Sequence, residues 1–247
     1  MQSLEYDRSF LAARILLDKI NANMIISGAF GLFEKKTVIA VGGYDNSTMG
    51  EDMELVVRLH EFSRMNRKPY KIDFAQDAIC WSQTPEKLSE LGKQRKRWQR
   101  GLFQCMWGHR KMLANPRYGA VGLLSYLYFL LYELLSPFIE LLGVLTMVLS
   151  VVMDMLNVKF MLVFLACYAL YGILLTLTAY FSRIYTIDQR FSFRELILAI
   201  TACFFETTFL RFYLEFVRVT AFVGYKKNKL NLSLIHISEP TRLGMIS

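Results

Sequence analysis

The sequence predicts an α/β domain followed by membrane helices, because two kinds of composition are segregated along its 247 residues. Residues 1–117 mix charged and apolar residues as a water-soluble domain does, whereas residues 118–224 are dominated by Leu, Phe, Val and Tyr. The whole chain is 54% hydrophobic, yet 20% of its residues are charged. Helical periodicity and strand-like stretches both occur in the first part, which gives the α/β class.

The net charge restricts the classes of binding partner, and the cysteines and histidines restrict the kinds of site that the chain can contain. A formal charge of +8 and a pI near 9.3 favour an anionic partner. Because long apolar runs are present, phospholipid headgroups and a nucleotide diphosphate rank above nucleic acid. The four cysteines are scattered without a CxxC pair, which favours reduced thiols over a disulfide framework or a zinc site. The three histidines are also dispersed, so no metal site is expected within this chain.

Periodicity and helix-stop signals give the elements of the first part. In order, we expect helical spacing over 4–20, a strand-like segment over 24–33, a short helix over 35–41 that ends at Gly42-Gly43, a firmer helix over 51–65, and one or two short strands over 70–81. Thr84, Pro85 and Glu86 then supply an N-cap, a proline at the first helical position and an acidic first turn. The next helix is therefore expected to start there and to run through Trp98.

The apolar part is expected to associate with a membrane. The stretch 102–113 has the profile of a helix lying on a membrane surface, and Asn115-Pro116 ends it. Residues 160–182 carry no charge over 23 positions, which as a helix is about 35 Å, enough to cross a bilayer. A kink is expected at Pro137. We therefore predict interfacial amphipathic helices over 102–136 and about three spans, at 137–156, 160–182 and 196–222.

The third predicted span carries four charges. Arg211 and Glu215 are spaced to pair on one helix face, which would let this segment cross if it packs against the others. Arginines in the preceding loop and lysines in the basic tail 225–231 both mark their segments as cytoplasmic. One span cannot leave both on the same side. Either the last apolar segment is re-entrant or the positive-inside rule fails there.

Both ends of the chain are expected to differ from those of the natural protein. Met1 is followed by no signal region, and the residues after it resemble the middle of a domain. Residues 232–247 resemble the in-frame translation of a sequencing-library adapter, so we exclude them from the predicted fold.

The first candidate motif, Gly50-Glu51-Asp52, opens the helix predicted over 51–65. Carboxylates favour helix N-termini because the helix dipole is positive there, so a structural role is the simpler interpretation of this motif alone. The functional alternative is that one carboxylate acts as a general base on an incoming hydroxyl.

The second motif is the basic run that contains Gln94, Arg97 and Trp98. Five cations in eight positions would also suit a helix on lipid headgroups. The three named residues are spaced i, i+3 and i+4, however, and so share one side of a helix. An arginine fork binds phosphate, an indole face stacks on a sugar ring, and an amide bonds hydroxyls.

The third motif is Ser27-Gly28-Ala29-Phe30-Gly31. Its small residues let a substrate approach the backbone closely. Taken alone, it is equally compatible with an ordinary strand end.

In this order, and followed by apolar helices, the three motifs resemble processive, membrane-bound family 2 glycosyltransferases, such as cellulose, chitin, hyaluronan and poly-N-acetylglucosamine synthases. The resemblance runs from about Gln2 to Leu230 and implies that 1–101 is the C-terminal, acceptor half of a GT-A catalytic domain. It implies that Asp52 is the catalytic base. The residues that it places at the acceptor and diphosphate sites are Glu51, Gln94, Arg97, Trp98, Ser27, Gly28, Ala29 and Phe30.

The implied reaction is the inverting transfer of a sugar from a nucleotide diphosphate sugar to a hydroxyl of a growing glycan. It would take place at the cytosolic face of the cytoplasmic membrane, with Mg²⁺ or Mn²⁺ on the diphosphate. Two features depart from the family pattern. The aspartates that bind the metal have no counterpart in this chain, which is therefore expected to be inactive alone. Gly50 also replaces the usual threonine.

Two other functions remain open from the sequence. A non-enzymatic membrane transport or assembly subunit explains the apolar half and the positive charge equally well, but not the joint occurrence of the motifs at Asp52 and Trp98. A non-processive family 2 enzyme that acts on a lipid-linked sugar would share the base without a polymer channel.

Overall fold

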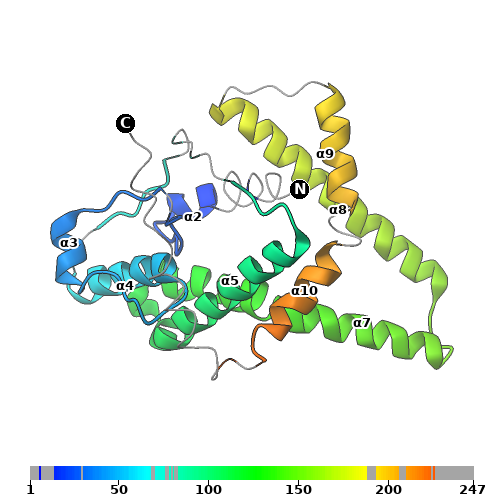
Figure 1. Ribbon diagram of the computed structural model, residues 1–247, viewed down its shortest axis with the longest axis horizontal. Helices are drawn as coiled ribbons and strands as arrows, with labels where there is room; N and C mark the ends of the chain where they lie inside the picture. Colours follow the sequence, from blue (N-terminus) through cyan, green and yellow to red (C-terminus); the bar gives the residue numbers. More distant parts are fainter. Residues whose placement is uncertain are drawn as a thin grey trace.

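The computed structural model describes residues 6, 14–28, 30–67, 70–75, 78, 80, 83–187, 193–205, 210–223 and 225. A compact helical body carries long apolar helices that extend away from it (Figure 1). In chain order the elements are α2 (Ile15–Lys19), α3 (Lys35–Ala40), α4 (Glu51–Met65), α5 (Leu88–Gly108), η2 (Arg110–Met112), η3 (Pro116–Tyr118), η4 (Val121–Ser125), α6 (Tyr126–Tyr128), η5 (Phe129–Leu134), α7 (Ser136–Val152), α8 (Val158–Ile187), α9 (Phe193–Phe205) and α10 (Arg211–Thr220).

The strands predicted over 24–33 and 70–81 are wrong for the described residues of those segments, which form no ladder and include a turn in which Phe30 N–H donates to Ser27 O at 3.1 Å. Side chains form hydrogen bonds with the backbone groups that a neighbouring strand would otherwise bind. Asn21 donates to the carbonyl of Tyr70 and accepts from Ile72 N–H, both at 3.1 Å. Asp18 accepts from Phe74 N–H at 2.8 Å. The 70–75 segment is thus held at the end of α2 by side-chain hydrogen bonds.

The helices predicted over 35–41 and 51–65 are confirmed as α3 and α4. After α3, Gly42 and Gly43 have φ of +94° and +76°, a left-handed conformation that favours glycine. The Arg58 guanidinium of α4 then donates to the carbonyls of Val41 and Gly43, each at 2.7 Å, and so fastens the end of α3 to α4.

Helix α5 is longer than predicted and begins later. Lys87 is extended (φ −107°, ψ 143°), so the helix starts at Leu88 rather than beside Thr84. It then continues without a break to Gly108 and contains most of the surface helix predicted over 102–113. Its C-terminal half packs on α4 and on the 118–129 region. The core they share is Ala22, Met24, Met53, Val57, Cys105, Met106, Met112, Tyr118, Val121, Tyr126, Phe129 and Leu134.

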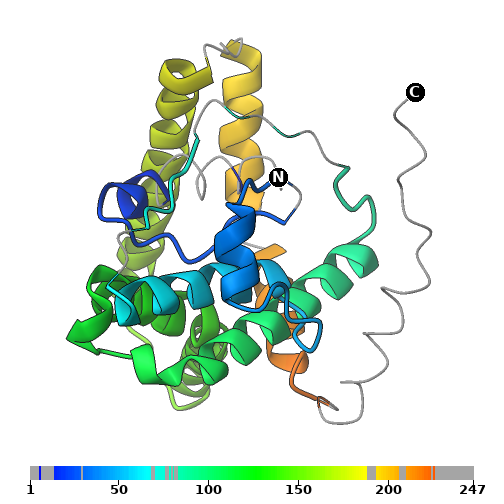
Figure 2. The ribbon, with the colours of Figure 1, turned by 90° about the vertical axis from the view of Figure 1, so that its left-hand side faces the viewer.

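The predicted kink at Pro137 is confirmed, since the helical stretch 121–134 and α7 meet at 45°. Within the described part, no single helix is both long and apolar enough to cross a bilayer, whereas this bent pair passes the same test together. Helix α8 covers the segment predicted as a span over 160–182 and lies beside α9 (Figure 2). Many large apolar side chains of α7 and α8 are exposed.

The third predicted span, 196–222, is divided between α9 and α10, and residues 206–209 lie outside the described ranges. Helix α10 packs against both α5 and α7 (Figure 1). The predicted pairing of Arg211 with Glu215 is replaced by two others. Arg211 binds both carboxylate oxygens of Glu140 on α7, with Nε at 2.7 Å, and Glu215 pairs with Arg218 at 3.1 Å.

Candidate functional site

The carboxylate of Asp52 lies half-buried in the first turn of α4 and is oriented by two backbone groups. Gly28 N–H donates to Oδ2 at 3.2 Å, and Met53 N–H donates to Oδ1 at 2.8 Å. Each oxygen of a carboxylate can accept two hydrogen bonds, so both retain capacity for a further donor. Asp52 can therefore accept a proton from a hydroxyl that approaches this turn. Glu51 lies half-buried immediately before it.

The Ser27–Gly31 motif contacts Asp52 directly. A Cβ atom at Gly28 would lie 3.3 Å from Asp52 Cβ, so the absence of a side chain permits this approach. Ser27 is half-buried, and Phe30 is 59% exposed and available to a substrate. Ala29 lies outside the described residues. The first and third sequence motifs thus meet at one place.

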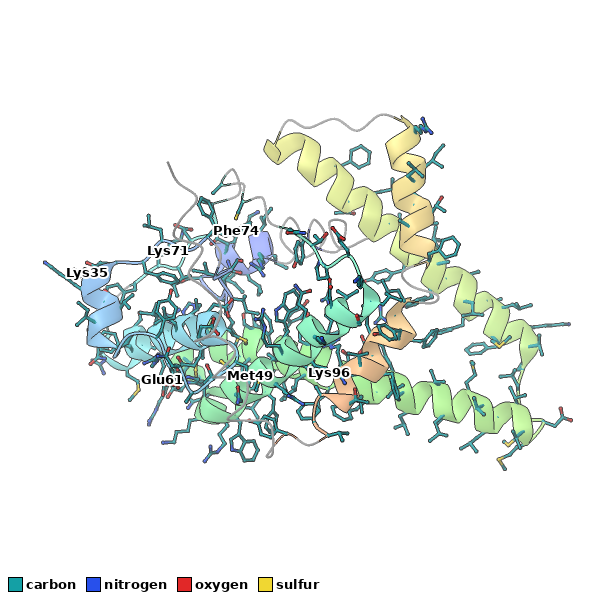
Figure 3. All side chains as sticks on the ribbon, in the orientation of Figure 1. Lys35, Met49, Glu61, Lys71, Phe74 and Lys96 are labelled. Atoms are coloured by element: carbon teal, nitrogen blue, oxygen red, sulfur yellow. The ribbon has the colours of Figure 1, made fainter. Side chains whose placement is uncertain are left out.

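Helices α4 and α5 meet at a contact between two glycines. A Cβ atom at Gly101 would lie 2.7 Å from Gly50 N, and one at Gly50 would lie 3.2 Å from Gly101 Cα. The adjacent Met49 N–H donates to Gln104 Oε1 at 2.8 Å, and Figure 3 shows Met49 beside α5. The glycine in place of the family's threonine therefore has a local reason, which is the close approach of α5.

The basic run on α5 divides into two faces. Arg97 is exposed and Trp98 is 38% exposed, whereas Gln94 is half-buried. Arg95 Cζ lies over the Trp98 ring, 4.8 Å from its centroid, and covers one face of the indole. Gln99 and Arg100, which follow directly, are buried. Trp98 precedes by one turn the Gly101 that packs on Gly50 before α4.

Arg14 is a neighbour of Asp52 that the sequence analysis missed. Burial lowers the pKa of Arg14 to about 10, and the negative charges of Asp52 and Glu133 oppose this effect. The side chain therefore adds positive charge close to Asp52. Arg14 belongs to the segment 4–20, for which the sequence predicts helical spacing. Its position relative to Asp52 depends on tertiary packing that no local sequence pattern encodes.

A second missed group joins α4 to the end of α5. His109 Nδ1 lies 2.7 Å from Glu61 Oε2, and His109 Nε2 lies 3.4 Å from Glu54 Oε1. Glu54 also pairs with Arg58 at 2.6 Å. Burial alone would lower the pKa of His109, but the hydrogen bonds and charges of the two glutamates outweigh it and raise that pKa. Glu54, Arg58 and Glu61 share one face of α4 (i, i+4, i+7), a pattern that could have signalled the cluster.

The described residues do not offer the ligand set of a divalent cation. Among them, no three His, Cys, Asp or Glu side chains converge as a set of metal ligands. Both oxygens of Asp52 are directed by backbone N–H groups. These residues do not fit a metal ion.

Comparison with known proteins shows the family of the chain. The sequence model described as "Glycosyl transferase family group 2" matches residues 1–223. A poly-beta-1,6-N-acetyl-D-glucosamine synthase of Staphylococcus aureus (strain COL) is 37% identical over 90 residues, which are 36% of this chain and 19% of that protein. The synthase of the same name from Staphylococcus epidermidis is 31% identical over 115 residues, or 47% and 25% of the two chains.

The chain thus spans about a quarter or less of the curated relatives that it matches. No solved structure matches it. The family match covers most of the chain and includes all three motifs. The chain belongs to glycosyltransferase family group 2.

Proposed function

We propose that the enzyme containing this chain transfers a sugar from a nucleotide diphosphate sugar to a hydroxyl of a growing glycan, with inversion and with Asp52 as general base. Family membership supports sugar transfer from a glycosyl donor and favours an enzyme over a transport or assembly subunit. The observation that carries the proposal is the packing of Gly50 on Gly101, which brings the helix start with Asp52 against the helix with Trp98.

In this proposal the acceptor hydroxyl attacks the anomeric carbon of the donor sugar. The bond from that carbon to the diphosphate oxygen breaks, and the hydroxyl proton passes to Asp52. The exposed Arg97 fork would bind oxygens of the leaving diphosphate, with Gln94 on the same side of the helix. The Trp98 face opposite Arg95 would stack on the acceptor sugar, and residues 27–30 would line its path.

We further propose that 1–101 forms the acceptor half of a GT-A catalytic domain, which is the fold of this family, on the cytosolic face of the cytoplasmic membrane. The bent pair and α8 would cross the bilayer, because their exposed side chains are largely apolar. Helix α10 would not cross, since its polar face packs on α5. This favours the re-entrant alternative for the last apolar segment.

The relatives' names make N-acetylglucosamine the first donor sugar to test. The test is Asp52→Asn in the full-length enzyme, in membrane vesicles with a nucleotide-activated N-acetylglucosamine. Asparagine keeps one of the two hydrogen-bond acceptors but cannot take the proton, so we expect transfer to fall by roughly 10²- to 10⁴-fold. Retention of near-wild-type transfer would show that Asp52 is not the base.

The matched control is Asp45→Asn. Asp45 lies in the polar turn before α4 and accepts from Ser47 N–H at 2.8 Å, an interaction that asparagine can keep. Transfer by this variant is expected to equal that of the wild type. The length of the products then separates a polymerase from an enzyme that adds one sugar to a lipid-linked acceptor.

A further inference from the structure

The bend before α7 leaves two backbone carbonyls without helical donors. Pro137 has no N–H, so the carbonyl of Glu133, four residues earlier, cannot accept a helical hydrogen bond from it. Phe138 N–H donates instead to Leu135 O at 3.1 Å, which leaves the carbonyl of Leu134 without its helical donor as well. Carbonyls in an apolar setting require another donor.

Two side chains from distant elements supply these donors. Gln99 Nε2 of α5 donates to Leu134 O at 3.0 Å, and Arg218 Nη2 of α10 donates to Glu133 O. The two are joined to each other, because Arg218 Nε donates to Gln99 Oε1 at 2.9 Å. Arg218 Nη1 also pairs with the buried Glu215 at 3.1 Å, which neutralises its charge. One guanidinium thus links α5, α10 and the bend.

Helix α10 lies along the part of α5 that carries the basic run. At one end Tyr213 OH donates to Leu88 O at 3.1 Å, and a Cβ atom at Gly92 would lie 3.0 Å from the same hydroxyl. At the other end Arg100 Nε donates to Ala221 O at 2.5 Å. The contacts extend from residue 88 to residue 100, on the buried side of the helix whose other side presents Trp98.

We propose that Arg218 is a positioning residue of the transferase: through Gln99 it fixes the orientation of α5, and so of Arg97 and Trp98 relative to Asp52, against the bend at Pro137. The inference rests on the proposed function of those side chains. Its physical content is that α5 and the bent helix share a set of hydrogen bonds that neither completes alone. A change at the bend is therefore expected to change the position of Trp98.

The test begins with Arg218→Lys in the full-length enzyme. Lysine keeps a positive charge beside Glu215 but cannot donate along the three directions of the guanidinium fork. We expect kcat per folded enzyme to fall roughly tenfold to a hundredfold, as for a small misplacement of a catalytic group, with little change in KM for the nucleotide sugar. Hydrogen–deuterium exchange of amides 94–101 should become faster.

The matched control is Arg211→Lys, the same change on the same helix. Arg211 forms its ion pair with Glu140 of α7, so kcat and exchange of 94–101 should stay at wild-type values. Gln99→Met removes the same link from the α5 side and leaves the Arg218–Glu215 pair in place, so it should reproduce the loss of kcat. It also serves as the test if Arg218→Lys does not fold.

Pro137→Ala supplies the decisive comparison, because alanine restores an N–H that can donate to Glu133 O. In the Arg218→Lys background it should recover part of the lost kcat, while in the wild-type background it should not raise kcat. Additive effects of the two substitutions, or equal behaviour of Arg218→Lys and Arg211→Lys, would overturn the inference. Hydrogen–deuterium exchange of amides 94–101 tests the positioning of α5 even if the wild-type enzyme transfers no sugar. A failure of this inference can therefore be told apart from a failure of the proposed function.

Discussion

At the scale of single residues, His109 combines burial with two carboxylate partners, and its contacts with them join the end of α5 to α4. The groups that face it are Glu54 and Glu61 on α4, with Arg58 bound to Glu54, and Cys105 on its own helix, which interacts with the same Glu54. Burial raises the pKa of the Cys105 thiol, so that thiol stays neutral. Arg58 and, when it is protonated, His109 therefore supply the positive charge that faces the two glutamates.

This arrangement predicts the sign of a pH dependence. The glutamates raise the pKa of folded His109 against the effect of burial, so its contribution to stability is fully present below the pKa of an unfolded histidine. That contribution is lost as pH rises through the folded pKa. We expect the difference in Tm between wild type and His109→Gln to be largest at acid pH and to shrink as pH rises. A difference in Tm that grows with pH would contradict this.

His60 provides the contrast within the same helix. Its Nε2 lies 2.8 Å from the carbonyl of Asn23, and burial lowers its pKa to about 4. An unfolded histidine takes up a proton as pH falls through 6.5, whereas folded His60 stays neutral down to about 4, so the contribution of His60 to stability is lost as pH falls, opposite in sign to that of His109. The difference in Tm between wild type and His60→Gln should therefore be constant above about pH 7 and should shrink as pH falls from 6.5 to about 4.

The sequence predicted the site in part at this scale. It singled out Asp52, Gln94, Arg97 and Trp98 as candidates, because helix starts and helix-face spacing are local patterns. It could not identify Arg14 or His109, since their roles depend on contacts with residues far away in the chain. The charge of Arg14 acts on Asp52, and His109 lies against residues about 50 positions earlier.

At the scale of elements, the contact between Gly50 and Gly101 fixes how α4 meets α5. A Cβ atom at Gly101 would be 2.7 to 3.0 Å from backbone atoms of residues 49 and 50, which cannot turn aside as a side chain can. Gly101→Ala should therefore separate the helices. We expect a loss of roughly 1–3 kcal/mol in unfolding free energy and a fall in kcat of up to about 10²-fold.

Gly108→Ala is the matched control on the same helix, because a Cβ atom there meets nothing within 4 Å. Both substitutions raise helix propensity, so only the contact with Gly50 differs between them. Urea unfolding and initial rates of sugar transfer compare the two. Equal stability and kcat for both variants would show that the glycine contact does not position the site.

The elements themselves were predictable where local signals decide them. Helices α3 and α4 follow the sequence because Gly42-Gly43 and the acidic start at Glu51 are strong boundary signals. The extended segment 70–75 was misassigned, since Asp18 and Asn21 complete its backbone hydrogen bonds in place of a strand. A pattern of β-forming residues does not reveal which partner will satisfy the backbone.

At the scale of the whole molecule, the exposed apolar surface is concentrated on the helices that extend from the body. On α8, Leu170 is 57% exposed, and on α7, Leu142 is 60% exposed. Figure 1 shows these helices reaching away from the body rather than packing into it. A continuous apolar surface of this kind requires lipid or another protein to cover it.

Lipid is the covering that we propose, and a single charge tests it. Leu170→Lys places an ammonium group near the middle of α8, where a bilayer would impose a cost of about 2.5–3.5 kcal/mol. We expect the full-length enzyme to lose most of its carbonate-resistant membrane insertion. Ile39→Lys on α3 is the control, since Ile39 is 66% exposed on the body and should lie in water. If both variants insert as well as wild type, the exposed face of α8 contacts water or protein instead. Both positions are exposed, and only a surrounding of hydrocarbon would make lysine reduce membrane insertion at Leu170 but not at Ile39.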